Sequence, residues 1–154
     1  MTARELMGRY AMADHVENGQ FVERHYVHEG PGRPASGSMY YYVAPGERTE
    51  FHRIDCDEYW CYAEGEPLEL WVVDEENTVR ILRLGVAEGC EPLAYLKKGW
   101  IFASRHDGNG TDGTFLTCIT VPRFQYEGFE MFSEEEMLAR TNELSGFFRE
   151  RETK

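Results

Sequence analysis

The stretch 46–65 holds the side chains best suited to chemistry. It carries His52 and Glu58, with Ile54 between them. Residues two apart on a strand point to the same face, so His52 and Ile54 share one face, and Glu58 opens the next strand after a turn. An imidazole beside a carboxylate can accept and deliver a proton near neutral pH. The sequence therefore predicts an acid–base site in which Glu58 or Asp57 orients His52.

The same side chains have an alternative use as metal ligands. Divalent metals are held by histidine nitrogens and carboxylate oxygens, usually from three or four residues. If a metal is bound, His52 and Glu58 are its predicted ligands, and His15, His28 or His106 would have to complete the site from a loop that folds inward. Because two protein ligands bind a metal weakly, we expect no cofactor and keep a divalent metal as the alternative.

Aromatic side chains alternate along the strands near this pair. Trp60 and Tyr62 share a face with Glu58, and Tyr40 and Tyr42 share a face on an earlier strand. Such rings could stack on a flat or sugar-like ligand. They could equally fill the interior of a small packed barrel. We take these four residues as candidate ligand contacts, with the Tyr62 hydroxyl also a candidate acid.

Acidic side chains outnumber basic ones, with 28 Asp and Glu against 16 Lys and Arg. The 154 residues carry a net charge of −12, which argues against a nucleic acid or an anionic membrane as partner. Arg105 ends a predicted strand, where it could reach an anionic ligand or remain solvated.

The four cysteines form no C-x-x-C pair, and we interpret them as reduced packing residues. With no apolar stretch of transmembrane length and no secretory signal, a cytoplasmic location is expected.

The elements that must position these residues are mostly short strands. Thr2 with Glu5 and Ser133 with Glu136 form two capping boxes, which predict a helix to about residue 12 and another over about 134–149. A turn is expected at 107–113, where glycine, aspartate and asparagine gather. Many short strands separated by turns predict one all-β domain, a sandwich or barrel. The expected strands are 20–27, 38–44, 49–54, 58–63, 68–74, 78–84, 93–96, 100–104 and 114–121.

The spacing of Gly46, His52, Glu58 and Gly65 resembles the first motif of the cupins. Ile54 stands where that motif normally has a second histidine. In the matching second motif, 97–102, the glycine is kept and Phe102 replaces the histidine. The sequence is also similar to the small single-domain Cupin-5 proteins from about residue 15 to 138, in three stretches: His15-Val16-Glu17-Asn18-Gly19-Gln20-Phe21-Val22-Glu23, His52-Arg53-Ile54-Asp55-Cys56-Asp57-Glu58-Tyr59-Trp60, and Val121-Pro122-Arg123-Phe124 with Phe129-Glu130.

This resemblance implies an all-β double-stranded β-helix, or jelly-roll barrel, with short terminal helices and a homodimer. The single cupin domain would span 1–154, with its core at about 15–132. The Cupin-5 family in turn resembles the dTDP-sugar 3,5-epimerases. Of their nucleotide-contacting stretch only Gly19, Phe21 and Glu23 remain, and the arginine of that stretch falls at Asn18. By this likeness Phe21 and Glu23 are candidate substrate contacts.

Three functions follow from these observations. The first is a metal-independent isomerase, epimerase or lyase acting on a polar, carbohydrate-like molecule. His52 would abstract a proton next to a carbonyl, Glu58 would orient it, and Tyr62 would serve as acid. The second is a small-ligand binding or sensing module without turnover, and the third is a metal-dependent cupin enzyme. Loss of turnover in a folded His52→Ala variant would favour an enzyme over a binding module.

Overall fold

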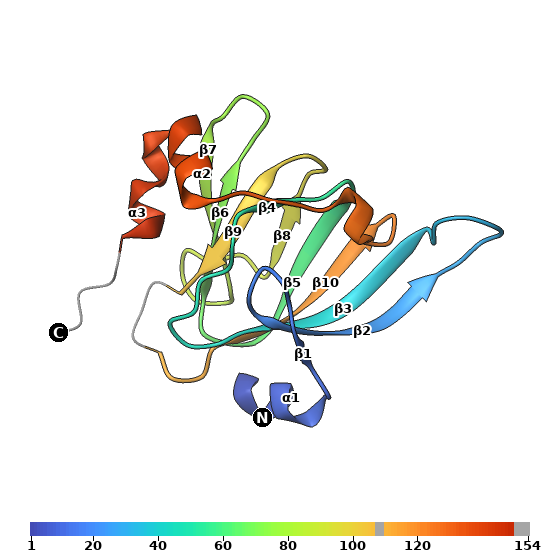
Figure 1. Cartoon of the computed structure of the whole chain (residues 1–154). Coiled ribbons are helices and arrows are strands. Elements are labelled where there is room, and N and C mark those ends of the chain that lie inside the picture. The colour runs from blue at the N-terminus through green and yellow to red at the C-terminus, as the bar shows by residue number, and fades with distance from the viewer. Residues whose placement is uncertain (107–109, 150–154) are drawn as a thin grey trace.

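Two antiparallel sheets make up most of the structure, a computed structural model that describes residues 1–106 and 110–149 (Figure 1). Within the described residues the larger sheet has six strands in the order β1-β2-β3-β10-β5-β8, and the smaller has five in the order β11-β4-β9-β6-β7. The larger sheet contains β1 (Ala13–Asp14), β2 (Gln20–Val27), β3 (Ser36–Val43), β10 (Thr114–Val121), β5 (Asp57–Gly65) and β8 (Leu93–Leu96). The smaller contains β11 (Glu130–Met131), β4 (His52–Arg53), β9 (Ile101–Arg105), β6 (Leu68–Val73) and β7 (Val79–Leu84).

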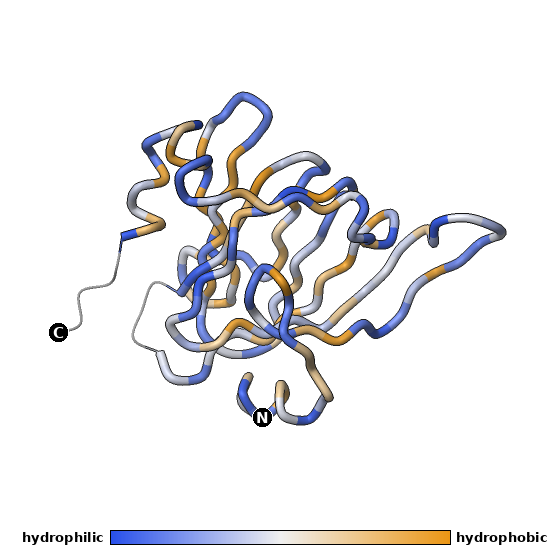
Figure 2. The backbone as a smooth tube through the Cα atoms, in the orientation of Figure 1, coloured by the Kyte–Doolittle hydropathy of each residue, from blue (hydrophilic) through white to orange (hydrophobic). Residues whose placement is uncertain are grey.

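The main core lies between the two sheets. Tyr41, Trp60 and Leu116 reach it from the larger sheet, and Leu70 and Phe102 reach it from the smaller one. Figure 2 shows apolar residues recurring along the strands that face this interior. Burial of this apolar surface is the main favourable contribution to the free energy of folding. The expected all-β jelly-roll architecture is confirmed.

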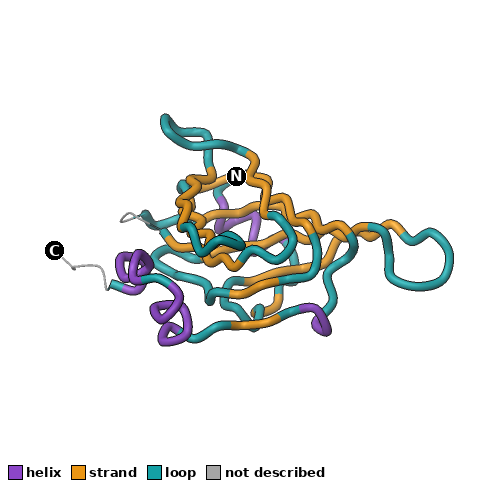
Figure 3. Tube along the Cα trace, turned by 90° about the horizontal axis from the view of Figure 1, so that it is seen from above, coloured by secondary structure: helices purple, strands orange, loops and turns teal. Residues whose placement is uncertain are grey.

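Short helices cover the outer face of each sheet (Figure 3). α1 (Ala3–Arg9) packs on the larger sheet, and its capping box of Thr2 and Glu5 is present. α2 (Glu134–Arg140), the 3-10 helix η2 (Asn142–Leu144) and α3 (Ser145–Phe148) cover the smaller sheet. The single helix expected over 134–149 is interrupted at Thr141, which is extended and whose hydroxyl accepts from the Glu143 N–H. That side-chain hydrogen bond competes with helix continuation and starts a new helix.

The side-chain orientation on β3 differs from the prediction. Tyr41 points into the main core, whereas Tyr40 and Tyr42 pack outward with Phe115 against α1. Alternation places Tyr40 and Tyr42 on one face, but three consecutive tyrosines do not reveal which face that is. The apolar side of α1 decides it, because it covers the outer surface of this strand.

Other elements agree with the sequence or differ from it in length, and β5, predicted at 58–63, is longer than expected. The strand predicted at 49–54 is reduced to β4, while β2, β8 and β10 have the predicted bounds. The β2–β3 hairpin projects beyond the rest of the molecule (Figures 1 and 3). The turn predicted at 107–113 includes residues 107–109, which lie outside the described residues. None of the helices in the described part of the chain has the length and apolar character needed to cross a bilayer.

Candidate functional site

A tight turn between β1 and β2 carries two ionisable side chains inward. The His15 N–H bonds the Gly19 carbonyl at 2.9 Å, and Asn18 and Gly19 have φ of 77° and 75°. A Cβ at Gly19 would lie 2.5 Å from the Tyr41 hydroxyl, which itself donates to the Asn18 carbonyl at 2.6 Å. Glycine is therefore required here both for its positive φ and for the close approach of Tyr41.

The same turn is fastened to the segment before β4. The Glu50 N–H donates to the Glu17 carbonyl at 2.8 Å, and the Asn18 amide donates to the Arg48 carbonyl at 3.1 Å. These bonds give hydrogen-bond partners to backbone groups that would otherwise be left unpaired when the turn packs against this segment. They also bring the side chain of Glu17 over the strand that carries His52.

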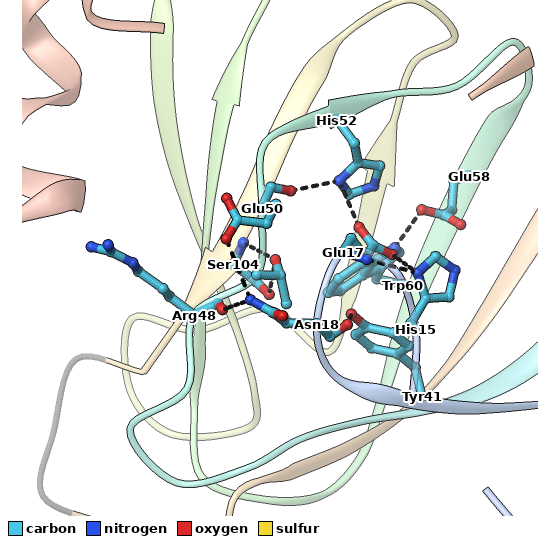
Figure 4. A network of polar contacts seen from close by, with 11 residues as sticks. His15, Glu17, Asn18, Tyr41, Arg48, Glu50, His52, Glu58, Trp60 and Ser104 are labelled. Atoms are coloured by element: carbon cyan, nitrogen blue, oxygen red, sulfur yellow. Dashed lines mark hydrogen bonds and ion pairs between the residues drawn. The ribbon is translucent and has the colours of Figure 1, made fainter. Parts of the chain in front are cut away.

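Glu17 and His52 form a buried pair (Figure 4). Nδ1 of His52 lies 2.6 Å from a Glu17 carboxylate oxygen and 2.9 Å from the Glu50 carbonyl, and both partners are acceptors. Nδ1 therefore carries a proton, shared between the two oxygens. That carboxylate oxygen has no other hydrogen-bond partner among the described residues. Burial lowers the pKa of His52, but the charge and hydrogen bond of Glu17 and the Glu50 carbonyl outweigh it, and the net pKa is raised.

His15 lies on the other side of the Glu17 carboxylate, and its ring is neutral. Burial lowers the pKa of His15, more strongly than Glu17 raises it, and His52 lowers it further. Nδ1 of His15 accepts the Glu17 N–H at 3.3 Å, which assigns the remaining proton to Nε2. The approach of the Glu17 carboxylate to Nδ1, at 3.5 Å, is therefore no ion pair at neutral pH.

Glu58 is the second buried carboxyl group of the site. Burial raises its pKa to about 7, although the Trp60 hydrogen bond and His52 lower it and Glu17 raises it further. The Trp60 indole N–H donates to Glu58 at 2.6 Å and fixes its orientation. A carboxyl group with a pKa near 7 is poised to exchange protons under physiological conditions.

A cavity of about 240 Å³ opens beside these groups. Its lining includes the buried His15 and Glu58 and, nearer to solvent, Arg123 and the half-exposed Tyr126. Phe21 also lines it and lies 4.8 Å from His15, ring to ring. His52 does not line this cavity and lies behind it with Glu17. Two titratable side chains, His15 and Glu58, therefore line one mostly apolar hollow.

The structure separates the predicted site residues into two groups. Phe21, Glu23 and Glu58 lie at the cavity, and Trp60 supports Glu58 from the core. Glu17 rather than Glu58 contacts His52. Asp57, the alternative partner of His52, accepts instead from the Lys98 N–H and the Tyr95 hydroxyl.

The remaining candidates lie elsewhere. The Tyr62 hydroxyl donates to the Gly65 carbonyl at 2.6 Å, at the far end of β5. Tyr40 and Tyr42 pack against α1, on the outer face of the larger sheet. Arg105 binds Glu69 at 2.8 Å and the Gly146 carbonyl at 2.7 Å, which ties α3 to the smaller sheet and keeps its guanidinium away from the cavity.

The donor set at the cupin metal position does not fit a metal ion. Ile54 and Phe102, at two of the motif's histidine positions, have no donor atom, and the Phe102 ring packs 4.3 Å from that of His52. The Nε2 of His106 contacts the Thr114 hydroxyl at 2.8 Å, and that of His28 contacts the Gly32 carbonyl at 3.0 Å. Within 1–106 and 110–149, no group of three or more His, Cys, Asp or Glu residues is arranged to hold a metal.

Sequence reasoning missed the roles of Glu17 and His15. Both lie in a turn, where strand alternation does not say which way a side chain points. The available signal was local: an acidic residue directly before Asn18 and Gly19, a pair that favours a positive φ, within a stretch similar to a family motif.

The comparisons with known proteins agree with this fold. The family described as "Cupin superfamily (DUF985)" matches residues 4–132. A structure of a Shewanella oneidensis protein is similar with 27% identity and a TM-score of 0.86, covering 95% of this chain and 94% of that one. A hypothetical protein from Leishmania major has 25% identity and a TM-score of 0.81, covering 93% and 94%. Oxalate decarboxylase from Bacillus subtilis shares the fold, with 20% identity, a TM-score of 0.60 and coverage of 89% and 34%. No curated protein matches the chain.

Proposed function

The chain belongs to the Cupin superfamily (DUF985) family, and from this premise we propose that it is a metal-independent enzyme that moves a proton on a small polar molecule. Isomerisation, epimerisation and elimination all begin with such a transfer next to a carbonyl. One observation carries the proposal: Glu58, with a pKa of about 7, and the neutral His15 line the same cavity. Pairs of groups with environments that set different protonation states are typical of acid–base sites.

The roles follow from the protonation states. The ionised Glu58 accepts the proton from the carbon beside the carbonyl, and the bonding electron pair moves toward the carbonyl oxygen. The Nε2–H of His15 donates a hydrogen bond to that oxygen and stabilises its developing negative charge. In an isomerisation Glu58, now protonated, returns the proton to the former carbonyl carbon, and the proton of the neighbouring hydroxyl moves to the former carbonyl oxygen, so that the carbonyl changes place with no net gain or loss of protons. Glu17 and His52 are positioning residues, because they fix the turn of His15 and the charge balance around Glu58.

The test is exchange of a carbon-bound proton with solvent. Aldoses, ketoses and 2-hydroxy ketones are incubated with the protein in D₂O and followed by proton NMR. The wild type is expected to exchange the proton next to the carbonyl, and Glu58→Gln to lose about 100-fold or more of that rate. Glu64→Gln, an exposed change on the same strand, is the matched control. Exchange that is unchanged in Glu58→Gln would refute the assignment of the base.

A non-catalytic binding module is the second candidate, favoured by the aromatic wall of the cavity. The rings of Phe124 and Tyr126 lie 5.0 Å apart, and that of Phe124 lies 6.2 Å from His15. Such a wall can hold a flat ligand without any proton transfer. A binding module predicts ligand-induced thermal stabilisation that survives Glu58→Gln and His52→Ala. The expected homodimer, cytoplasmic location and lack of nucleic-acid or membrane partners stay predictions.

A further inference from the structure

We propose that Arg123 determines the specificity of the cavity by selecting ligands that carry a carboxylate group. The inference rests on the proposed function only for the choice of site, since the carboxylate would lie at the mouth of the cavity that contains Glu58 and His15. It adds a substrate class and a recognition residue that the acid–base groups do not provide.

Arg123 is held in place at the cavity by several contacts. Its Nη2 and Nε bind the two carboxylate oxygens of Glu23 at 2.6 Å and 3.0 Å, and its guanidinium lies 4.1 Å from the Tyr26 ring centre. Its backbone is also fixed, because its N–H donates to the Pro34 carbonyl and its carbonyl accepts from Arg33. A side chain ordered before binding loses less conformational entropy when a ligand arrives.

Gly37 on β3 leaves the space through which this side chain passes. A Cβ at Gly37 would lie 2.9 Å from Cγ and 3.4 Å from Cβ of Arg123. These atoms are close to the backbone and have little freedom to move aside. The absence of a side chain at residue 37 therefore makes room for the Arg123 side chain beside β3, where both residues line the cavity.

Glu23 occupies only one edge of the guanidinium group. Glu23 accepts from the Nε hydrogen and from one hydrogen of Nη2. The second edge of the guanidinium group, which is formed by Nη1 and the other hydrogen of Nη2, makes no bond to Glu23. The structure shows no partner for Nη1 among the described residues. Such an edge matches the planar geometry of a carboxylate and can bind it through two parallel hydrogen bonds.

The surrounding charges favour a carboxylate over a phosphate. Arg123 is the only lysine or arginine among the described residues that line the cavity, and Glu23 already balances its charge. Glu58 lines the same cavity, and Glu17 lies behind it. A dianion would meet stronger repulsion from these carboxylates than a monoanion does. The aromatic lining can stack on the flat face of a sugar-like or aromatic body attached to the carboxylate.

Equilibrium binding of benzoate, benzamide and phenyl phosphate tests this inference without turnover. Isothermal titration calorimetry on the full chain should show benzoate binding about tenfold or more tightly than benzamide, which has nearly the same shape without the charge. Arg123→Gln should abolish this preference. Gly37→Ala should weaken benzoate binding while keeping every charge, and Arg24→Gln, which lies on β2 with its guanidinium over Tyr10 and Tyr40, is the matched control.

Each remaining outcome overturns the proposal. These are no benzoate binding, equal affinity for benzoate and benzamide, tighter binding of phenyl phosphate, a preference kept in Arg123→Gln, or an equal loss in Arg24→Gln. The proposed function fails separately: intact benzoate selectivity with no solvent exchange on any substrate carbon would refute proton transfer alone. Exchange that depends on Glu58 but shows no preference for carboxylates would refute the role of Arg123 alone.

Discussion

A Glu17 carboxylate oxygen lies 2.6 Å from Nδ1 of His52, and both side chains are almost fully buried. The partner of the motif histidine thus comes from the turn before β2 rather than from the carboxylate of its own motif, Glu58. Among the described residues, the Trp60 indole is then the one hydrogen-bond partner of the Glu58 side chain, which also lines the cavity. In the proposed function the two carboxyl groups consequently have different tasks: Glu17 sets the charge of His52, and Glu58 exchanges protons with the substrate.

Glu17→Gln should lower the pKa of His52. The raised pKa of this imidazole results from Glu17 and the Glu50 carbonyl, which together outweigh burial, so loss of the carboxylate charge leaves burial dominant. Because the folded pKa is raised, the stabilisation by this pair is fully present below about pH 6.5 and is lost as pH rises through the folded pKa. NMR titration of the His52 ring measures the shift. Glu50→Gln is the control, since its backbone carbonyl makes the contact, and an unchanged pKa in Glu17→Gln would contradict the pairing.

Glu58→Gln should stabilise the fold at alkaline pH. The pKa of Glu58 is raised from 4.5 to about 7, so the folded state retains a proton that the unfolded state releases. The stability of the wild type therefore falls as pH rises between these values, by on the order of 3 kcal/mol in total. Urea denaturation at pH 4 and pH 8 should show near-equal stabilities at pH 4 and a more stable variant at pH 8. A variant that is less stable at pH 8 would argue against a desolvated carboxylate.

Gly19→Ala should destabilise the protein and loosen the turn that carries Glu17. A positive φ costs a residue with a Cβ about 1 kcal/mol, and the new Cβ would collide with the buried Tyr41 hydroxyl. Urea denaturation gives the loss of stability. Because the new Cβ would also lie 2.6 Å from the ring carbon Cζ of Tyr41, the shorter side chain of Tyr41→Leu in the same background should recover part of that loss. Additive effects of the two substitutions would contradict direct contact between them.

The purified, untagged protein should contain far less than one transition-metal ion per chain, even after reloading. Ile54 and Phe102 supply no donor atoms, which leaves the motif positions with His52 and Glu58 alone. Elemental analysis measures iron, manganese, nickel and zinc directly. Near-stoichiometric metal that is lost in His52→Ala would overturn this prediction and restore the metal-dependent alternative.

The fold was predictable because its signals are local. Glycine, proline and asparagine mark the turns between alternating strands, and Thr2 and Ser133 cap helices whose first turns agree with the sequence. The break at Thr141 was missed because it depends on one hydroxyl bonding a nearby N–H. The three successive tyrosines at 40–42 did not allow the inward-facing side of the strand to be predicted, because that side is decided by the packing of α1 against the other one.

The candidate site was only half predictable. The spacing of His52, Glu58 and Trp60 placed these side chains in the interior, since they lie on strands with a clear alternation. The pairing of His52 with Glu17 depends on a turn bonded to a distant segment, and no periodicity encodes that contact. Arg123 was likewise visible only as part of the stretch Val121-Pro122-Arg123-Phe124, because its approach to Gly37 joins two distant segments.

The turn that carries Glu17 has a consequence for how members of this family diverge. It supplies the charge beside His52 from outside the central strands, so a substitution there would change the proton affinity of the histidine while leaving both sheets intact. Two family members with superimposable barrels could then differ in reactivity through this short segment alone. Within this turn Glu17 is the position to redesign, because its side chain sets the charge beside His52, whereas Gly19 is fixed by its close approach to the core residue Tyr41.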